Sequence, residues 1–281
     1  MDYRRKKQAI IVSILALVLV LILTGAYYKW FYQRATCFDN KQNQNEGGVD
    51  CGGSCAMSCE ILTVKKLEVE WVKAIFLKDG VYDLAAKITN PNPNFGLEKF
   101  DYVFSLFDAD NQLLAKKEGS SFVLPNQAKY LVEVNIALAV RPAKAELVIA
   151  EPVRTNWRRL RNGFQAPDMY VHDKQFKILG SEEGAQLASA QVSGIIKNNS
   201  DFDFDKVSLA VLLFDAKKEI VGVNRTEAYT IPAGEERYFS VLWFSPFNGE
   251  VKSMDVLADT NLFSDSNFMK RYSEPEKFQE Y

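Results

Sequence analysis

The chain contains a single histidine, His172, among 281 residues. Histidine is the commonest general base and a frequent zinc ligand, so its scarcity argues against most hydrolases and zinc enzymes. The net charge is also small, because 34 basic residues nearly balance 36 acidic ones and leave −2. Without a basic surplus, nucleic acid is not an expected partner. The sequence also lacks a nucleophile elbow and a phosphate-binding loop. We therefore expect a protein that is not an enzyme.

Only one long apolar run is present, the eighteen uncharged residues from Ala9 to Ala26. At about 1.5 Å per residue this run covers most of a roughly 30 Å hydrocarbon core, and two tyrosines extend it. Four basic residues precede it: Arg4, Arg5, Lys6 and Lys7. The pattern predicts a cytoplasmic tail over 1–8 and a single transmembrane helix over 9–28, with the rest of the chain outside. The alternative is a signal peptide cleaved after Thr24-Gly25-Ala26.

All four cysteines fall between positions 37 and 59, in a segment that we expect to be a stalk over 29–60. They are Cys37, Cys51, Cys55 and Cys59. An even number of clustered cysteines on the outer side of a membrane favours two disulfides, with three connectivities open. A zinc site is the alternative, but no pair has the CxxC spacing that such sites commonly use.

The string at positions 50–55, Asp-Cys-Gly-Gly-Ser-Cys, ends a segment that resembles a short cysteine-bounded module of bacterial surface proteins. Oxygen-bearing side chains lie before it at Asp39, Asn43 and Glu46, and at its first residue, Asp50. Calcium takes six to eight oxygen ligands, so these four residues are a candidate calcium site. The spacing differs from an EF-hand loop, and the terminal bidentate glutamate of that loop is missing. The alternative is a polar turn held by disulfides, with no ion and no cofactor.

The outer part of the chain contains an internal repeat. In each copy an Asn is followed by a strand that ends in Leu-Phe-Asp and then by a Pro. The first copy has Asn90, Asp108 and Pro125, and the second has Asn198, Asp215 and Pro232. The spacings agree to within one residue. Such a repeat predicts two copies of one small domain.

Alternating apolar residues predict strands in both copies. In the first domain, 61–150, we expect about seven short strands, including 81–89, 102–106, 130–138 and 145–149. In the second domain, 167–260, strands are expected near 168–179, 190–196, 207–213, 238–244 and 251–257. Many short strands separated by turns are typical of an antiparallel β-sandwich. The polar tail, 261–281, is expected to be partly disordered.

The repeated strand resembles the FxLYD family of extracellular β-sandwich domains. The first copy reads Phe104-x-Leu106-Phe107-Asp108, and the second keeps only Leu213-Phe214-Asp215. The resemblance implies a mainly β, immunoglobulin-like fold and a binding or structural role in a bacterial cell envelope, without catalytic residues. The Asp of the motif is interpreted as a turn former that bonds the backbone two residues on.

Between the domains, the expected linker 151–166 is rich in arginine. A candidate patch for anionic envelope polymer or lipid comprises Arg154, Trp157, Arg158, Arg159 and Arg161. Such a patch would act through its positive charge. The alternative is a solvated connector whose arginines pair with nearby carboxylates.

Together these features predict a membrane-anchored, extracytoplasmic protein that presents two tandem β-sandwich domains. Its expected partners are the membrane and other envelope or surface proteins, as in an accessory subunit of a surface assembly. Strand addition to a sandwich edge is the expected binding mechanism. The alternatives are a pure spacer and an envelope hydrolase.

Overall fold

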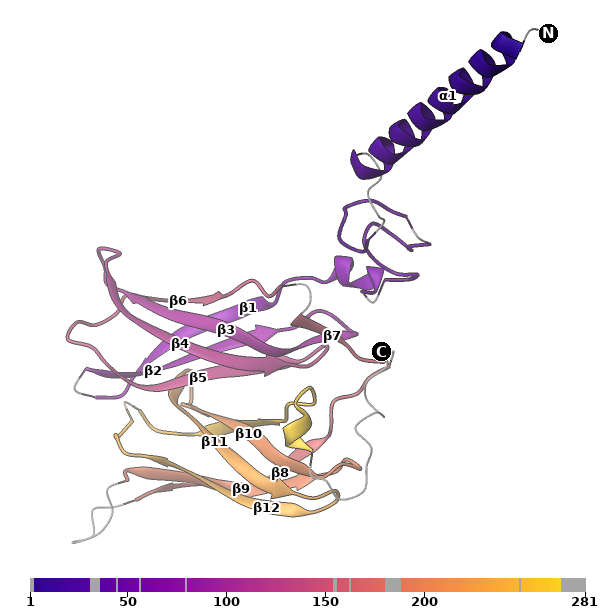
Figure 1. Cartoon of the computed structure of the whole chain (residues 1–281). Helices are drawn as coiled ribbons and strands as arrows, with labels where there is room; N and C mark the ends of the chain where they lie inside the picture. Colours follow the sequence, from indigo (N-terminus) through magenta and orange to yellow (C-terminus); the bar gives the residue numbers. More distant parts are fainter. Residues whose placement is uncertain are drawn as a thin grey trace. The chain divides into compact units, whose positions relative to one another are not determined.

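A computed structural model describes residues 3–30, 36–43, 45–55, 57–78, 80–153, 156–161, 163–179, 188–247 and 249–268 (Figure 1). The chain divides into two units, residues 1–63 and 64–281. The first holds a long helix and the cysteine-bounded module. The second holds all of the described strands. The mainly β fold with one long apolar N-terminal helix is therefore confirmed.

Helix α1 spans Tyr3–Trp30. Its 28 residues rise about 42 Å, which exceeds the thickness of a bilayer core. Its apolar side chains are exposed all round in the chain by itself, as is expected of a helix whose surroundings are lipid. By length and composition the helix can cross a membrane, and an N-terminal signal sequence would pass the same test.

The first sandwich is built from two antiparallel sheets of strands β1 to β6. The strand bounds are β1 Glu68–Phe76, β2 Val81–Thr89, β3 Phe95–Phe107, β4 Leu113–Val123, β5 Ala128–Ala137 and β6 Lys144–Ile149. One sheet has the order β1-β2-β5, and the other has the order β4-β3-β6. The buried residues Tyr102, Phe104 and Leu106 stand two apart along β3, so they share the side of the sheet that faces the core.

The second sandwich repeats this topology strand for strand. Its strands are β8 Met169–Ile178, β9 Ala190–Asn198, β10 Phe204–Phe214, β11 Ile220–Ile231, β12 Glu236–Trp243 and β13 Ser253–Asp259. The sheet orders β12-β9-β8 and β11-β10-β13 match those of the first sandwich when β8 is equated with β1 and β13 with β6. The internal repeat of the sequence is therefore a repeat of one fold.

The Leu-Phe-Asp motif forms the same turn in both copies. Asp108 Oδ1 accepts hydrogen bonds from the backbone N–H groups of Asp110 and Gln112 at 3.0 and 2.8 Å. Asp215 Oδ1 accepts from Lys217 and Glu219 at 2.8 and 2.9 Å. The Asp is thus the turn former that the sequence indicated, and its second bond closes the turn four residues on.

The structure adds two features to the expected linker and tail. Trp157–Arg159, in the expected linker, forms a short strand β7 that pairs with Phe95–Leu97 of β3. The segment after Asp259 is ordered as far as Phe268, with Leu262 and Phe263 buried in the core of the second sandwich. Isolated apolar residues in polar surroundings give too weak a periodic signal to predict such packing. Residues 269–281 lie outside the described residues.

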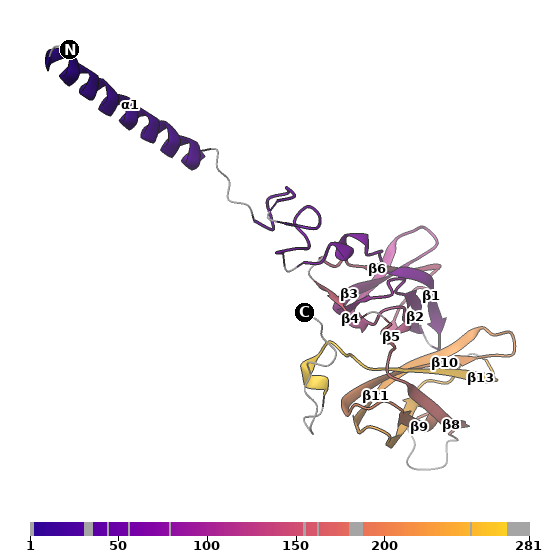
Figure 2. The ribbon, with the colours of Figure 1, turned by 90° about the vertical axis from the view of Figure 1, so that its right-hand side faces the viewer.

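The two sandwiches pack against each other. The outer face of the β1-β2-β5 sheet meets that of the β11-β10-β13 sheet, and a small apolar cluster closes the contact (Figures 1 and 2). Its buried members are Ile75, Ala85, Val132, Leu212 and Val223. The second unit is therefore a single body of four β layers, and not two separate domains joined by a flexible linker.

Candidate functional site

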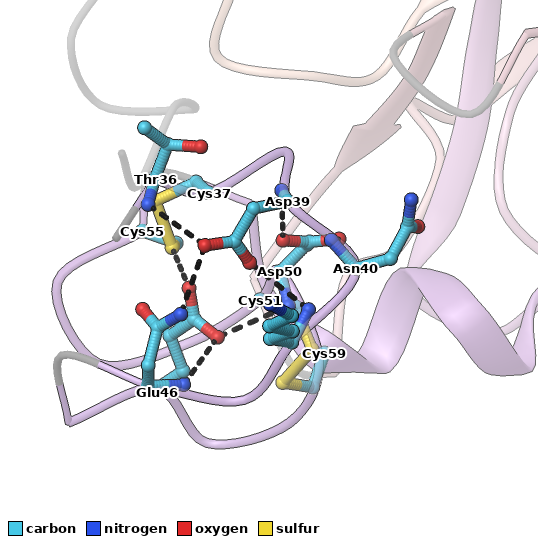
Figure 3. The surroundings of a disulfide bond; sticks show 11 residues. Thr36, Cys37, Asp39, Asn40, Glu46, Asp50, Cys51, Cys55 and Cys59 are labelled. Atoms are coloured by element: carbon cyan, nitrogen blue, oxygen red, sulfur yellow. Dashed lines mark hydrogen bonds between the residues drawn. A yellow bond between two sulfur atoms is a disulfide. The ribbon is translucent and has the colours of Figure 1, made fainter. Parts of the chain in front are cut away.

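The cysteine-bounded module is closed by two disulfides, Cys37–Cys55 and Cys51–Cys59 (Figure 3). This pairing is one of the three that the sequence left open. The short helix η1, Cys59–Thr63, follows at the second bridge. Disulfides persist in oxidising compartments, so the pairing agrees with a position outside the cytoplasm.

Three carboxylates hold the module together by accepting backbone hydrogen bonds (Figure 3). Asp50 accepts from the N–H groups of Asp39 and Asn40, both at 2.9 Å. Glu46 Oε2 accepts from the N–H groups of Asn43 and Asp50 at 3.1 and 3.2 Å. The hydrogen bond from Asn43 Nδ2, at 2.9 Å, is the largest cause that lowers the pKa of Asp39. The acids therefore replace a hydrophobic core that so short a segment cannot build.

The paired glycines of the module have a steric role. Gly53 has a φ of +59°, and a Cβ on it would lie 1.8 Å from the carbonyl oxygen of Asn45. Neither the left-handed backbone nor this close approach tolerates a side chain. The Gly-Gly pair in the Asp-Cys-Gly-Gly-Ser-Cys string is therefore explained by the fold of the module itself.

The four candidate calcium ligands meet some requirements of a calcium site but not others. The structure brings Asp39, Asn43, Glu46 and Asp50 into one hydrogen-bonded cluster. Asn43 Oδ1 is buried and accepts no hydrogen bond within the described residues, which is a property of a ligand oxygen. Calcium takes six to eight oxygens, however, and most carboxylate oxygens of this cluster already accept N–H groups. Calcium binding here stays a prediction.

A second grouping, Cys37, Glu46 and Cys55, also places potential metal ligands together. Glu46 Oε1 lies 3.2 Å from Cys55 Sγ. The two sulfurs are bonded to each other, so neither is a thiolate, and thiolate is the form that binds metal. The contact is a buried carboxylate packed against a disulfide.

The arginine-rich segment is positioned differently from the expected patch. Trp157 is buried, with 8% of its surface exposed, because β7 joins the sheet. Arg158 reaches Glu98 at 3.6 Å, as the connector interpretation expected. Arg159 and Arg161 remain partly accessible, and Arg154 lies outside the described residues.

The repeated Asn is a buried clamp in both sandwiches, a role that its spacing did not reveal. Asn90 is fully buried and donates through Nδ2 to the carbonyls of Phe95 and Leu124 at 2.7 and 2.9 Å. Asn198, also fully buried, donates to the carbonyls of Phe202 and Ile231 at 2.6 and 3.1 Å. Each clamp ties the loop that enters the third strand to the turn that contains the repeated Pro.

A buried ion pair crosses from the first sandwich to the second. Lys129 Nζ lies 2.7 Å from Asp259 Oδ2, and the two side chains are 7% and 8% exposed. The ammonium also sits over the ring of Phe122, and Gln127 donates to the same carboxylate oxygen at 3.2 Å. Burial lowers the pKa of Lys129, while the Asp259 carboxylate opposes this shift. Both charges are thus satisfied only when the sandwiches are together.

A second polar cluster surrounds the buried Glu133. Its Oε1 accepts from the hydroxyl of Tyr102 at 2.9 Å, and its Oε2 lies 3.4 Å from Arg225 of the second sandwich. Burial is the largest cause that raises the pKa of Tyr102, and the Glu133 carboxylate adds to it. A Cβ on Gly119 would lie 2.4 Å from the ring of Tyr102. The glycine therefore makes room for the tyrosine to reach the domain interface.

A crevice of about 740 Å³ lies beside these ion pairs, between the sandwiches. One wall comes from β4 and β5, and the other from β10 and β11. Residues of the C-terminal segment close one end: Asn261, Ser264, Ser266 and Asn267. Its volume falls in the range of about 300–1,000 Å³ that is typical of ligand sites.

His172 is far from a catalytic arrangement among the described residues. Its Nδ1 lies 3.1 Å from Asp173, its Nε2 lies 3.5 Å from Glu236, and its ring stacks on Tyr170. Both ring nitrogens face carboxylates, and no described hydroxyl or thiol nucleophile contacts the ring through a hydrogen bond. The arrangement is that of a half-buried histidine on the face of a sheet.

Sequence reasoning missed the interface charges, although a signal for them exists. Lys129, Leu131 and Glu133 alternate along β5, so they share one side of the strand, and Leu131 is buried in the sandwich. Charged residues on the same side as a core leucine are rarely buried unless paired. Such a pattern indicates a partner charge elsewhere in the fold.

Comparison with known proteins assigns no family. No family model matches the chain, and no curated protein matches it. Among solved structures, 52 chains are similar, including a transglutaminase of red sea bream at 11% identity. That match covers 70% of this chain and has a TM-score of 0.22, and the chain spans 29% of the transglutaminase. A similarity at this level assigns no function.

Proposed function

We propose that this chain is a non-catalytic, membrane-tethered binding or structural protein whose sandwich pair is presented outside the cytoplasmic membrane. The observation that carries the proposal is the docked pair itself. Three of its described buried charged residues, Lys129, Glu133 and Asp259, form contacts between the two copies of one fold. A body built in this way offers a fixed surface, which suits contact with a partner.

The proposed topology is a single uncleaved span with its N-terminus inside. Support comes from the basic residues that begin helix α1 and from the disulfides that follow it. Tyr27 and Tyr28 pack edge to face at the other end, where aromatic residues suit the headgroup layer. Mass spectrometry of the N-terminal peptide from washed membranes tests this topology. A chain that begins after Ala26 would contradict it.

Each sandwich is proposed to be an FxLYD-type domain of a bacterial cell envelope. Support comes from the shared strand order and from the identical Asp turns at Asp108 and Asp215. On this proposal the partner is another envelope or surface protein, and the chain is an accessory subunit of a surface assembly.

Anionic envelope polymer is the weaker candidate partner. It rests on Arg158, Arg159 and Arg161, of which Arg158 already has an acidic neighbour. Replacement of all three by Gln, followed by binding measurements with anionic glycans and anionic liposomes, tests it. Unchanged binding would remove this partner.

A pure spacer and an envelope hydrolase are the competing functions. Purification of the full chain from native membranes distinguishes a binding protein from a spacer. A binding protein should co-purify with a stoichiometric partner that is bound to the sandwiches. A panel of ester, glycoside and peptide substrates tests the hydrolase, and robust turnover would overturn the non-catalytic proposal.

A further inference from the structure

Strand β4 has one free edge, and it borders the crevice between the sandwiches. One side of β4 pairs with β3 throughout, whereas no described strand pairs with its other side. Three consecutive residues of β4, Ser120, Ser121 and Phe122, line the crevice. An unpaired strand edge presents a row of N–H and C=O groups, which is a template for another extended chain.

The neighbouring edges are less open. Strand β5 also lines the crevice, but Lys129, Leu131 and Val132 are buried there. On β11, Arg225 and Glu227 are held in ion pairs with Glu133 and Lys206. On β4, by contrast, Ser120 is exposed and Ser121 is half-buried. The edge of β4 near Ser120 is therefore one that an incoming strand can reach.

The charges of the crevice disfavour an anionic ligand. Three basic residues line it, and each faces an acid: Lys129 faces Asp259, Lys206 faces Glu227 and Arg225 faces Glu133. The other polar groups of the lining are mostly hydroxyls, including Ser208 and Thr226. A phosphate or a polyanion finds no uncommitted cation here. A segment without net charge, rich in backbone donors and acceptors, fits better.

We propose that the crevice takes an extended, uncharged peptide segment of a partner protein, which adds as a strand to the free edge of β4 near Ser120. Backbone hydrogen bonds supply the affinity, and the hydroxyl-lined wall of β10 and β11 selects small or polar side chains. This inference rests on the proposed function, because it names where the sandwich pair grips its partner. It also uses both sandwiches, since neither one alone forms the crevice.

The test uses the full chain in lipid nanodiscs and a phage library of random seven-residue peptides. Peptides selected on the wild-type chain are measured against Ser120→Lys and Ser120→Glu, which place opposite charges at the free edge. Val148→Lys is the matched control, because Val148 is exposed on β6, the strand at the opposite edge of the same sheet. Urea denaturation confirms that each variant is folded. Because Ser120 is exposed, we expect both substitutions at this position to leave the chain folded.

We expect uncharged peptides to bind the wild type and Val148→Lys equally, and to bind both Ser120 variants at least tenfold more weakly. Bound peptide should also slow hydrogen exchange at the amides of 119–122. Equal binding to all variants, failure to select any peptide, or binding of neutral oligosaccharides in place of peptides would overturn the proposal. A native partner that is retained by Ser120→Lys refutes this site alone, whereas no partner with any variant refutes the proposed function.

Discussion

Lys129 Nζ of the first sandwich lies 2.7 Å from Asp259 Oδ2 of the second, and both side chains are buried. A lone buried charge is costly, so the pair specifies one docked arrangement of the sandwiches. The apolar contact around Leu212 and Val223 strengthens the association of the two sandwiches. It does little to fix their relative orientation, because hydrophobic attraction is non-directional. The ion pair and the apolar cluster together account for the single four-layer body.

Removal of one member of this pair should therefore be costly. Lys129→Met leaves the Asp259 carboxylate buried without its cation, and we expect a loss of about 3–5 kcal/mol in the free energy of unfolding. The double variant Lys129→Met/Asp259→Leu should lose much less than the sum of the two single variants. Urea denaturation of the four chains measures this coupling. Additive losses would show that the two residues do not interact.

The clamp residues should be equally sensitive in both sandwiches. Asn90→Ala and Asn198→Ala each strip buried carbonyls of their donors, and we expect each to lose about 2–4 kcal/mol of stability. Asn199→Ala is the matched control, because Asn199 is exposed and its side chain bonds only the exposed Asp168. A loss for the control as large as that for Asn198→Ala, measured by urea denaturation, would refute the clamp.

The repeated elements were predictable from sequence because they are local. The spacing from Asn to Asp to Pro is a property of one strand and its turns, so it identified the repeat and the turn role of Asp108 and Asp215. The docking of the sandwiches was not predictable, since it depends on residues as far apart as Lys129 and Asp259. The burial of Trp157 was missed for the same reason. Strand β7 forms only because β3 extends to Phe95 and offers an edge.

Asp83 predicts a pH dependence of stability. It is 2% exposed on β2, and burial raises its pKa to about 6, with one N–H donor from Asn135 at 2.9 Å. The folded state thus favours the protonated carboxyl. This contribution is fully present below the unfolded pKa of about 3.9 and is lost as pH rises through about 6, by up to roughly 3 kcal/mol. Asp83→Asn should therefore be more stable than the wild type at pH 8 and about equal at pH 4.

Urea denaturation at the two pH values measures this difference. The control is Asp101→Asn, because Asp101 is exposed on β3 and its nearest cation, Lys99, is exposed as well. A wild type that gains stability steadily between pH 4 and pH 8 relative to Asp83→Asn would contradict the assignment.

The cysteine-bounded module should keep its shape without an ion. Its carboxylates already accept backbone N–H groups, and two disulfides close its loops. We expect EDTA to leave hydrogen exchange unchanged at the amides of Asp39, Asn40 and Asp50. Glu46→Gln should speed exchange at the amides of Asn43 and Asp50, because it weakens the hydrogen bonds that these two amides donate to Glu46. Faster exchange after EDTA, reversed by calcium, would instead establish the ion as part of the fold.

The most direct test of the account is quantitative cross-linking of the full chain in its native membranes, followed by mass spectrometry of the cross-linked peptides. The account predicts one stoichiometric partner, joined to residues of the docked sandwiches within 64–268 and exposed on the outer side. Its binding should weaken when Lys129→Met loosens the docking. A chain without any partner, or a partner joined only to residues 1–63, would contradict it.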